Sequence, residues 1–228
     1  MTNGRKEAIQ KLQLTSDIFW SIALKDVEAC QEVVRIITGE DIKLVEVRYQ
    51  ETILQLNNHS IRIDTWGRDS KERNIGIEMH TQSNENRIKR NRYNIASMDV
   101  RSLETGDQYD DIPDTWGIYI TQADFLKTKK GINKIERIVS GTKKEAPNGV
   151  SEYYVSLSCK GETEAQTELL RYIKNSDGVM DSKYFPNLVK RVRFLKEAEK
   201  GETVMCEIMD EIFRDGEARG DAVIIGLS

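Results

Sequence analysis

The chain has 228 residues, with 34 lysines and arginines against 38 aspartates and glutamates, so its formal net charge is −4 and its pI is near 5.5. This balance excludes a globally basic nucleic-acid coat protein, whose pI would typically exceed about 9. No apolar run approaches the roughly 18–20 residues that span a bilayer, and the first residues hold no apolar signal segment. We therefore expect a globular chain without a membrane segment.

The cysteines and histidines limit the chemistry. The chain has three cysteines, far apart and odd in number, and two histidines. Scattered cysteines form no disulfide framework, which favours a cytoplasmic location. Two histidines cannot build a His-rich zinc site, so any metal would be held by oxygen and would be a hard ion such as Mg²⁺, Mn²⁺ or Ca²⁺. The sequence also lacks the motifs of P-loop hydrolases, dinucleotide enzymes and serine hydrolases.

Hydrophobic spacing predicts the elements of the first half. Apolar residues at helical spacing predict one amphipathic helix over residues 17–38, capped by a residue among 15–17 and ended by Gly39. Period-two alternation then predicts four strands, which cover 42–49, 52–56, 60–66 and 74–80. Between them we expect a turn at Asn57-Asn58 and a charged loop over 67–73.

The second half predicts a long helix and then a mixture of strands and helices. The helix covers 84–105, the strands cover 115–122, 132–139 and 153–159, and the pattern is helical from 164 onwards. This order predicts an α/β domain with a mixed sheet over residues 1–160 and a C-terminal helical region over 161–228. That tail could be a lid, a separate subdomain or the element through which the chain forms a homodimer.

The feature that points to chemistry is the hairpin that carries Asp64 and Glu78. If its turn is centred on Lys71, the two acids face each other on neighbouring strands, with Cβ atoms roughly 5 Å apart. His80 shares the face of Glu78. Alternation in the first strand predicts that Asp64 shares its face with Arg62 and Trp66, and that Ile61, Ile63 and Thr65 lie on the other face.

Two carboxylates this close repel each other unless a cation or a shared proton lies between them. A divalent metal would take one oxygen from each of Asp64 and Glu78, the carbonyl of Met79, and water. Such a metal activates water and stabilises charge on a phosphoryl group. The alternative is that both acids are exposed residues on the solvated face of an antiparallel sheet.

An ordered series of motifs resembles the PD-(D/E)XK nuclease superfamily, and most closely its branch of recombination-promoting nucleases, also described as nuclease-family transposases. The core of the resemblance is Ile61-Arg62-Ile63-Asp64 followed by Asn74-Ile75-Gly76-Ile77-Glu78-Met79-His80. The resemblance spans roughly residues 15–215, and its other motifs are Thr15 to Trp20, Arg90 to Tyr93, Ser97 to Asp99, Gly106 to Tyr109 and Trp116 to Ile120.

The resemblance implies a restriction-endonuclease-like core, a mixed β-sheet flanked by helices, that cleaves DNA phosphodiesters with a divalent metal. Asp64 and Glu78 would hold that metal, most simply Mg²⁺. His80 stands where the superfamily commonly has Lys and this branch commonly has Gln, so it would donate a hydrogen bond or act as a base. The implied role is low-specificity cleavage linked to recombination or mobile elements. The alternative is a non-catalytic descendant that binds DNA or a protein.

Charge is unevenly distributed after the hairpin. Residues 85–103 hold five basic and two acidic side chains, a local charge of +3, and we expect their first part to contact DNA phosphates through Arg87, Lys89, Arg90 and Arg92. Residues 104–114 hold five acids and no base, a local charge of −5, and are expected to form a solvated loop. No base-reading motif is visible, which agrees with low sequence specificity.

Overall fold

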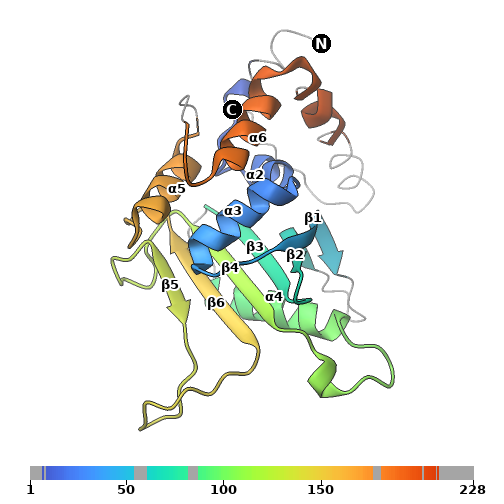
Figure 1. Ribbon diagram of the computed structural model, residues 1–228, viewed down its shortest axis with the longest axis vertical. Helices are drawn as coiled ribbons and strands as arrows, with labels where there is room; N and C mark the ends of the chain where they lie inside the picture. The colour runs from blue at the N-terminus through green and yellow to red at the C-terminus, as the bar shows by residue number, and fades with distance from the viewer. Residues whose placement is uncertain are drawn as a thin grey trace.

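Six strands form one mixed sheet in the computed structural model, which describes residues 7–210 except 8, 54–60, 82–86, 177–180, 202 and 209. The order across the sheet is β1-β2-β3-β4-β6-β5 (Figure 1). β1 to β3 and the β5–β6 pair are antiparallel, whereas β3, β4 and β6 are parallel. The strands are β1 (Leu44–Ile53), β2 (Ile61–Asp69), β3 (Asn74–His80), β4 (Thr115–Thr121), β5 (Ile132–Ile135) and β6 (Val150–Ser156). The predicted α/β class with a mixed sheet is confirmed.

Helices cover both faces of this sheet. Figure 1 shows α2 (Asp17–Leu24) and α3 (Val27–Thr38) on one face and α4 (Arg87–Arg101) on the other, with α5 (Glu164–Lys174) and α6 (Pro186–Glu197) beyond α3. A short 3-10 helix, η1 (Tyr109–Asp111), interrupts the segment after α4. A larger apolar cluster fills the α2/α3 side of the sheet. A smaller cluster fills the α4 side and consists of Ile53, Ile63, Trp66, Ile95 and Met98.

The prediction of a single helix over 17–38 is wrong, because the chain forms two helices, which are separated by Lys25 and Asp26. The Asp26 carboxylate accepts the N–H of Ala29 at 2.9 Å and so begins a new helix within the apolar repeat. The predicted ends are correct: Ser16 caps α2, and Gly39 ends α3 with a φ of 73°.

The strands also differ from their predicted bounds. β1 is continuous where two strands were expected, and the turn predicted at Asn57-Asn58 lies outside the described residues. β2 runs on into the predicted charged loop as far as Asp69. The buried carboxylate of Asp69 makes this possible, because it accepts the N–H groups of Lys71 and Arg73 at 2.9 Å each and closes a tight turn. The helix predicted over 84–105 forms α4, which ends at Arg101, four residues before the predicted end; its predicted start at 84–86 lies outside the described residues.

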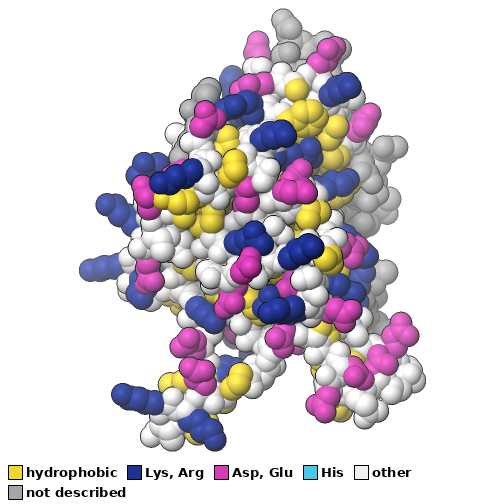
Figure 2. All heavy atoms as spheres, viewed as in Figure 1, with side chains coloured by type: hydrophobic (Ala, Val, Ile, Leu, Met, Phe, Trp, Pro, Cys, Tyr) yellow, Lys and Arg dark blue, Asp and Glu magenta, His cyan; other side chains and the backbone are white. Residues whose placement is uncertain are grey.

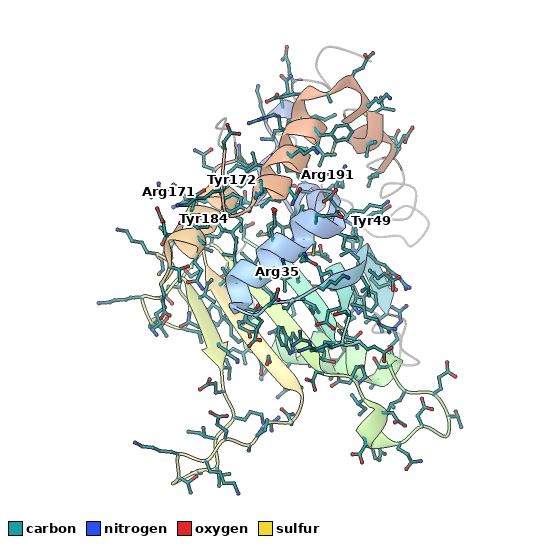
Figure 3. The ribbon with its side chains drawn as sticks, in the orientation of Figure 1. Arg35, Tyr49, Arg171, Tyr172, Tyr184 and Arg191 are labelled. Carbon is teal, nitrogen blue, oxygen red and sulfur yellow. The ribbon has the colours of Figure 1, made fainter. Side chains whose placement is uncertain are left out.

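The C-terminal helices pack on the N-terminal ones. Glu32 of α3 accepts the N–H groups of Asn187 and Leu188 at 3.1 and 2.9 Å, and so caps the start of α6. Arg191 of α6, labelled in Figure 3, donates to the carbonyl of Ile22 in α2 at 3.4 Å. Apolar residues of α5 and α6 belong to the larger cluster. Whether residues 161–228 act as a separate functional region stays a prediction. No helix among the described residues is long and apolar enough to cross a membrane.

Candidate active site

The register of the β2–β3 hairpin is the one predicted from symmetry about Lys71. Thr65 pairs with Ile77, and the pairing continues toward the turn to Arg68 and Asn74. Going the other way, the pairing ends at Thr65 and Ile77. The next residues along, Asp64 and Glu78, therefore stand where β2 and β3 part.

At that point the two carboxylates, rather than backbone carbonyls, accept the hydrogen bonds between β2 and β3. Asp64 Oδ2 accepts the N–H of Met79 at 2.9 Å, and Glu78 Oε1 accepts the N–H of Asp64 at 3.3 Å. Each acid thus binds a backbone donor on the opposite strand, and the two side chains converge. In a β-strand the N–H and C=O of one residue point to the same side. Because the N–H of Met79 faces Asp64, its carbonyl oxygen faces the same gap.

A shift of the side-chain alternation places Asp64 in this gap. The β1–β2 pairing passes from Tyr49–Thr65 to Glu51–Ile63 and skips Gln50 and Asp64. Gln50 has a φ of 47°, which is uncommon outside glycine. On one side of the skip Tyr49, labelled in Figure 3, packs against the larger cluster under Lys25 of α2.

The consequence is that the predicted faces of β2 are wrong in part. Ile63 and Trp66 lie three positions apart, so regular alternation would place them on opposite faces. Both belong instead to the smaller cluster under α4. Because the shift falls at Asp64, its side chain is free to reach across to β3 rather than point to either face.

The site is not on a solvated face, so that alternative is wrong. Glu78 is only 3% exposed, and Asp64 is partly buried. Helix α4 covers this face closely, since a Cβ added to Gly117 of β4 would lie 2.5 Å from Oδ1 of Asn91. Both acids are therefore shielded from water, so an uncompensated charge on either is costly.

Burial raises the pKa of both acids. The pKa of Asp64 rises to about 7, mainly through burial, although the N–H of Met79 opposes the rise. The pKa of Glu78 is raised well above its usual value by burial and then by the charge of Asp64. The positive charges of Arg90 and Arg62 oppose both shifts. A divalent cation would favour the ionised pair in the same way.

The four residues of α4 that were predicted to contact phosphates lie in three different environments. Nη2 of Arg90 lies 3.7 Å from Oε2 of Glu78, so the structure brings this residue directly to the site. Lys89 and Arg92 are exposed on α4. Arg87 is only 8% exposed, and its guanidinium lies 5.1 Å from the ring centroid of Phe125, so it packs inward rather than facing solvent.

His80 ends β3 on the face of Glu78. It pairs with Thr121 of β4, and its partly buried ring lies 6.1 Å from the ring of Tyr119. This places an imidazole two residues beyond Glu78 and at the same end of the sheet as Arg90.

Two contributors were not found from the sequence. Asp17, read only as a helix start, carries a charge that raises the pKa of Asp64, so it lies within electrostatic reach of the site from α2. Only the packing of α2 on β2 reveals this. Gln50 lies between two predicted strands and was given no role, because nothing in the neighbouring sequence predicts a left-handed backbone for a glutamine.

The donors present suit a small hard cation. Among the described residues, no group of three or more His, Cys, Asp or Glu side chains is arranged to hold a metal ion. The available protein donors are the carboxylates of Asp64 and Glu78 and the carbonyl of Met79. Mg²⁺ is typically bound through one or two carboxylates and keeps several waters, whereas Ca²⁺ takes 6–8 oxygen ligands. The donor set therefore fits Mg²⁺ better than Ca²⁺.

The acidic segment over 104–114 lies away from the site. Residue pairs along the parallel strands run from Asn74–Thr115 at one end to His80–Thr121 at the other. The segment leads into Thr115, so it lies at the end opposite His80. Figure 2 shows its acidic side chains gathered on the projection at the lower right, which Figure 1 identifies as the chain between α4 and β4. The negative charge is thus separated from the carboxylate pair.

Comparisons with family models, with curated proteins and with solved structures found no match to this chain.

Proposed function

We propose that the protein is a metal-dependent DNA endonuclease of the PD-(D/E)XK type, similar to the recombination-promoting branch. The observation that carries the proposal is the convergence of Asp64 and Glu78, each bound to a backbone N–H of the other strand, where β2 and β3 part. A mixed sheet flanked by helices also agrees with the core that the resemblance implies.

In this proposal Asp64, Glu78 and the carbonyl of Met79 hold one divalent cation, most simply Mg²⁺. The cation would supply Lewis-acid activation of water and stabilise charge on the scissile phosphate. His80 supplies a hydrogen-bond donor or a base at the end of β3. Arg90, Lys89 and Arg92 neutralise the DNA backbone, and Arg87 supports the start of α4 through Phe125. Cleavage has low sequence specificity and takes place in the cytoplasm.

The second candidate is a binding module without catalysis. The observation that favours it is His80 at the position where related enzymes commonly use Lys or Gln. Imidazole reaches less far than a lysine ammonium, and its ring is held near Tyr119. In that case the two carboxylates would only accept backbone N–H groups at the end of the hairpin, and α4 would still bind DNA.

A plasmid-nicking assay separates the two candidates. Purified protein is incubated with supercoiled plasmid and Mg²⁺ or Mn²⁺, beside Asp64→Asn and Glu78→Gln. These variants keep the size of each side chain and an oxygen for the backbone N–H. We expect nicking by the wild-type protein and a loss of at least about 100-fold in each variant, because each change removes a charged ligand.

The matched control is Asp110→Asn, which removes one carboxylate from the exposed acidic segment at the other end of the sheet. It should nick at the wild-type rate. Equal nicking by wild type, Asp64→Asn and Glu78→Gln with both metals would overturn the enzyme proposal. Retarded migration of DNA without nicking would then favour the binding module.

A further inference from the structure

Arg90 extends from α4 to the carboxylate pair, where its Nη2 lies 3.7 Å from Oε2 of Glu78. We propose that Arg90 is the built-in counter-ion of the carboxylate pair in the metal-free protein, and that it transfers to a DNA phosphate when a divalent cation takes its place. Arg90 would thereby couple metal binding to DNA binding. This inference rests on the proposed function.

The geometry makes the arginine and a cation competitors. Glu78 uses Oε1 to accept the N–H of Asp64, and Oε2 is the oxygen that lies 3.7 Å from the guanidinium. Oε2 is therefore the oxygen that Glu78 has left for a metal. A guanidinium beside this oxygen repels an incoming divalent cation, and the low exposure of Glu78 weakens the screening of that repulsion by water.

The side chain of Arg90 is also able to leave. It is 41% exposed, against 4% for the side chain of its partner Glu78. The distance of 3.7 Å is longer than that of a charge-assisted hydrogen bond, so the pair is held mainly by charge. Arg90 shares the first half of α4 with exposed Lys89 and Arg92, where a phosphate of a bound duplex would find several cations.

The helix supplies a matched comparison. Arg92 carries the same charge two residues later, and residues two apart on a helix do not share a face. Arg90→Met and Arg92→Met therefore remove the same charge from α4, but only the first removes it from beside Glu78. Any effect of net charge alone should be similar in both.

The test measures Mn²⁺ affinity by titration calorimetry, without DNA and then with a phosphorothioate duplex that resists cleavage. Without DNA, we expect Arg90→Met to bind Mn²⁺ about 3–10-fold more tightly than the wild type, and Arg92→Met to remain within about twofold. The duplex should raise Mn²⁺ affinity more in the wild type than in Arg90→Met, because coupling is reciprocal and the exchanging group is gone. Arg90→Lys, which keeps a charge, should behave like the wild type.

The outcomes separate this inference from the proposed function. If the wild type binds Mn²⁺ no better than Glu78→Gln, the metal site and the proposed function fail together. If the wild type binds Mn²⁺ through Glu78 but Arg90→Met matches Arg92→Met or binds more weakly, the counter-ion role is overturned and the nuclease proposal stands. Urea unfolding, which does not depend on metal, establishes for each of these variants that the protein is folded.

Discussion

At the scale of single residues, Asp64 and Glu78 hold backbone N–H groups that a regular ladder would have paired with carbonyls. They stabilise the end of the hairpin, yet their charges are costly there. The pKa of Asp64 near 7 means that the folded chain holds this proton far more tightly than the unfolded chain, in which the carboxyl has its usual pKa near 3.8. The contribution of Asp64 to the stability of the metal-free protein therefore falls as the pH rises from about 4 to about 7.

Asp64→Asn should relieve that cost. At pH 8 and without divalent ions, we expect it to raise the free energy of unfolding by about 1–3 kcal/mol, because it replaces a partly buried charge with an amide of the same shape. At pH 5 the folded wild type is already protonated at Asp64, so the gain should be small. Urea titrations at both pH values measure the difference. Asp110→Asn should change neither, and an equal gain at both pH values would contradict the pKa assigned to Asp64.

The sequence predicts that Asp64 and Glu78 lie opposite each other, but it does not predict the shift in β2 that turns Asp64 toward β3. Symmetry about Lys71 gave the register of the hairpin from the sequence alone. The shift at Asp64 depends on Gln50 in another strand and on the packing of Ile63 under α4. No local pattern encodes such a coincidence. The electrostatic reach of Asp17 is likewise a tertiary property, which the cap preference of an aspartate does not reveal.

At the scale of elements, two glycines of the sheet allow α4 to pack closely, because they have no side chain between the strands and the helix. A Cβ on Gly117 would lie 2.5 Å from Oδ1 of Asn91 and 2.8 Å from Cδ1 of Ile95, both buried. A Cβ on Gly76 would instead meet the flexible end of Met98 at 2.9 Å. β4 thus approaches α4 more closely than β3 does, and the nearest neighbour of Gly76 is the flexible end of Met98, which can move aside.

We expect Gly117→Ala to destabilise the protein by about 1–3 kcal/mol and to lower nicking, since it must displace α4 and with it Arg90. Gly76→Ala is the matched control and should cost less than about 1 kcal/mol, because Met98 can repack. Thermal unfolding and the plasmid assay measure both effects. A larger cost for Gly76→Ala than for Gly117→Ala would contradict this account of the α4 contact.

The elements show which physical signals a sequence carries. β3 was predicted with its observed bounds because its alternation is uninterrupted. The first helix was predicted too long because apolar spacing continues across Asp26, although the carboxylate of that residue caps a new helix. β2 was predicted too short because Asp69 and its charged neighbours resemble a loop in composition, while in the fold they close a turn.

At the scale of the whole molecule, the two ends of the described chain are joined by polar contacts as well as by the apolar core. Glu32 accepts three donors at the start of α6, the backbone N–H groups of Asn187 and Leu188 and the side-chain amide of Asn187. The residue before α6, Phe185, offers no side-chain cap of its own. Glu32, which lies 155 positions from Asn187 along the chain, therefore caps α6 in place of a neighbouring residue.

Glu32→Ala should lower the free energy of unfolding by about 1–2 kcal/mol, because it leaves these donors without an acceptor near a helix start. The change leaves the carboxylate pair untouched, so nicking per folded molecule should be unchanged. Glu136→Ala, which removes an exposed acid, should have no measurable effect on urea unfolding. A stability of Glu32→Ala equal to the wild type would show that the helices are held together by apolar packing alone.

The net charge of −4 conceals an arrangement that only the fold makes visible. The sequence gives a basic segment followed by an acidic one, and their closeness along the chain suggests that the charges cancel. Helix α4 runs from Arg90, which lies beside Glu78, to Asp99, which accepts a hydrogen bond from Thr115 at the start of β4. The acidic segment follows that far end. The local charges of +3 and −5 are therefore separated along α4 rather than mixed at one place.

The skipped pair in β1 and β2 determines how the side chains alternate along these two strands. Gln50 and Asp64 stand opposite each other, and the pairing on either side keeps the same register. If both were deleted, Tyr49 and Glu51 would become consecutive, as would Thr65 and Ile63, and side-chain alternation would be regular across this point. The two residues thus have the form of a matched insertion, one in each strand of a ladder complete without them.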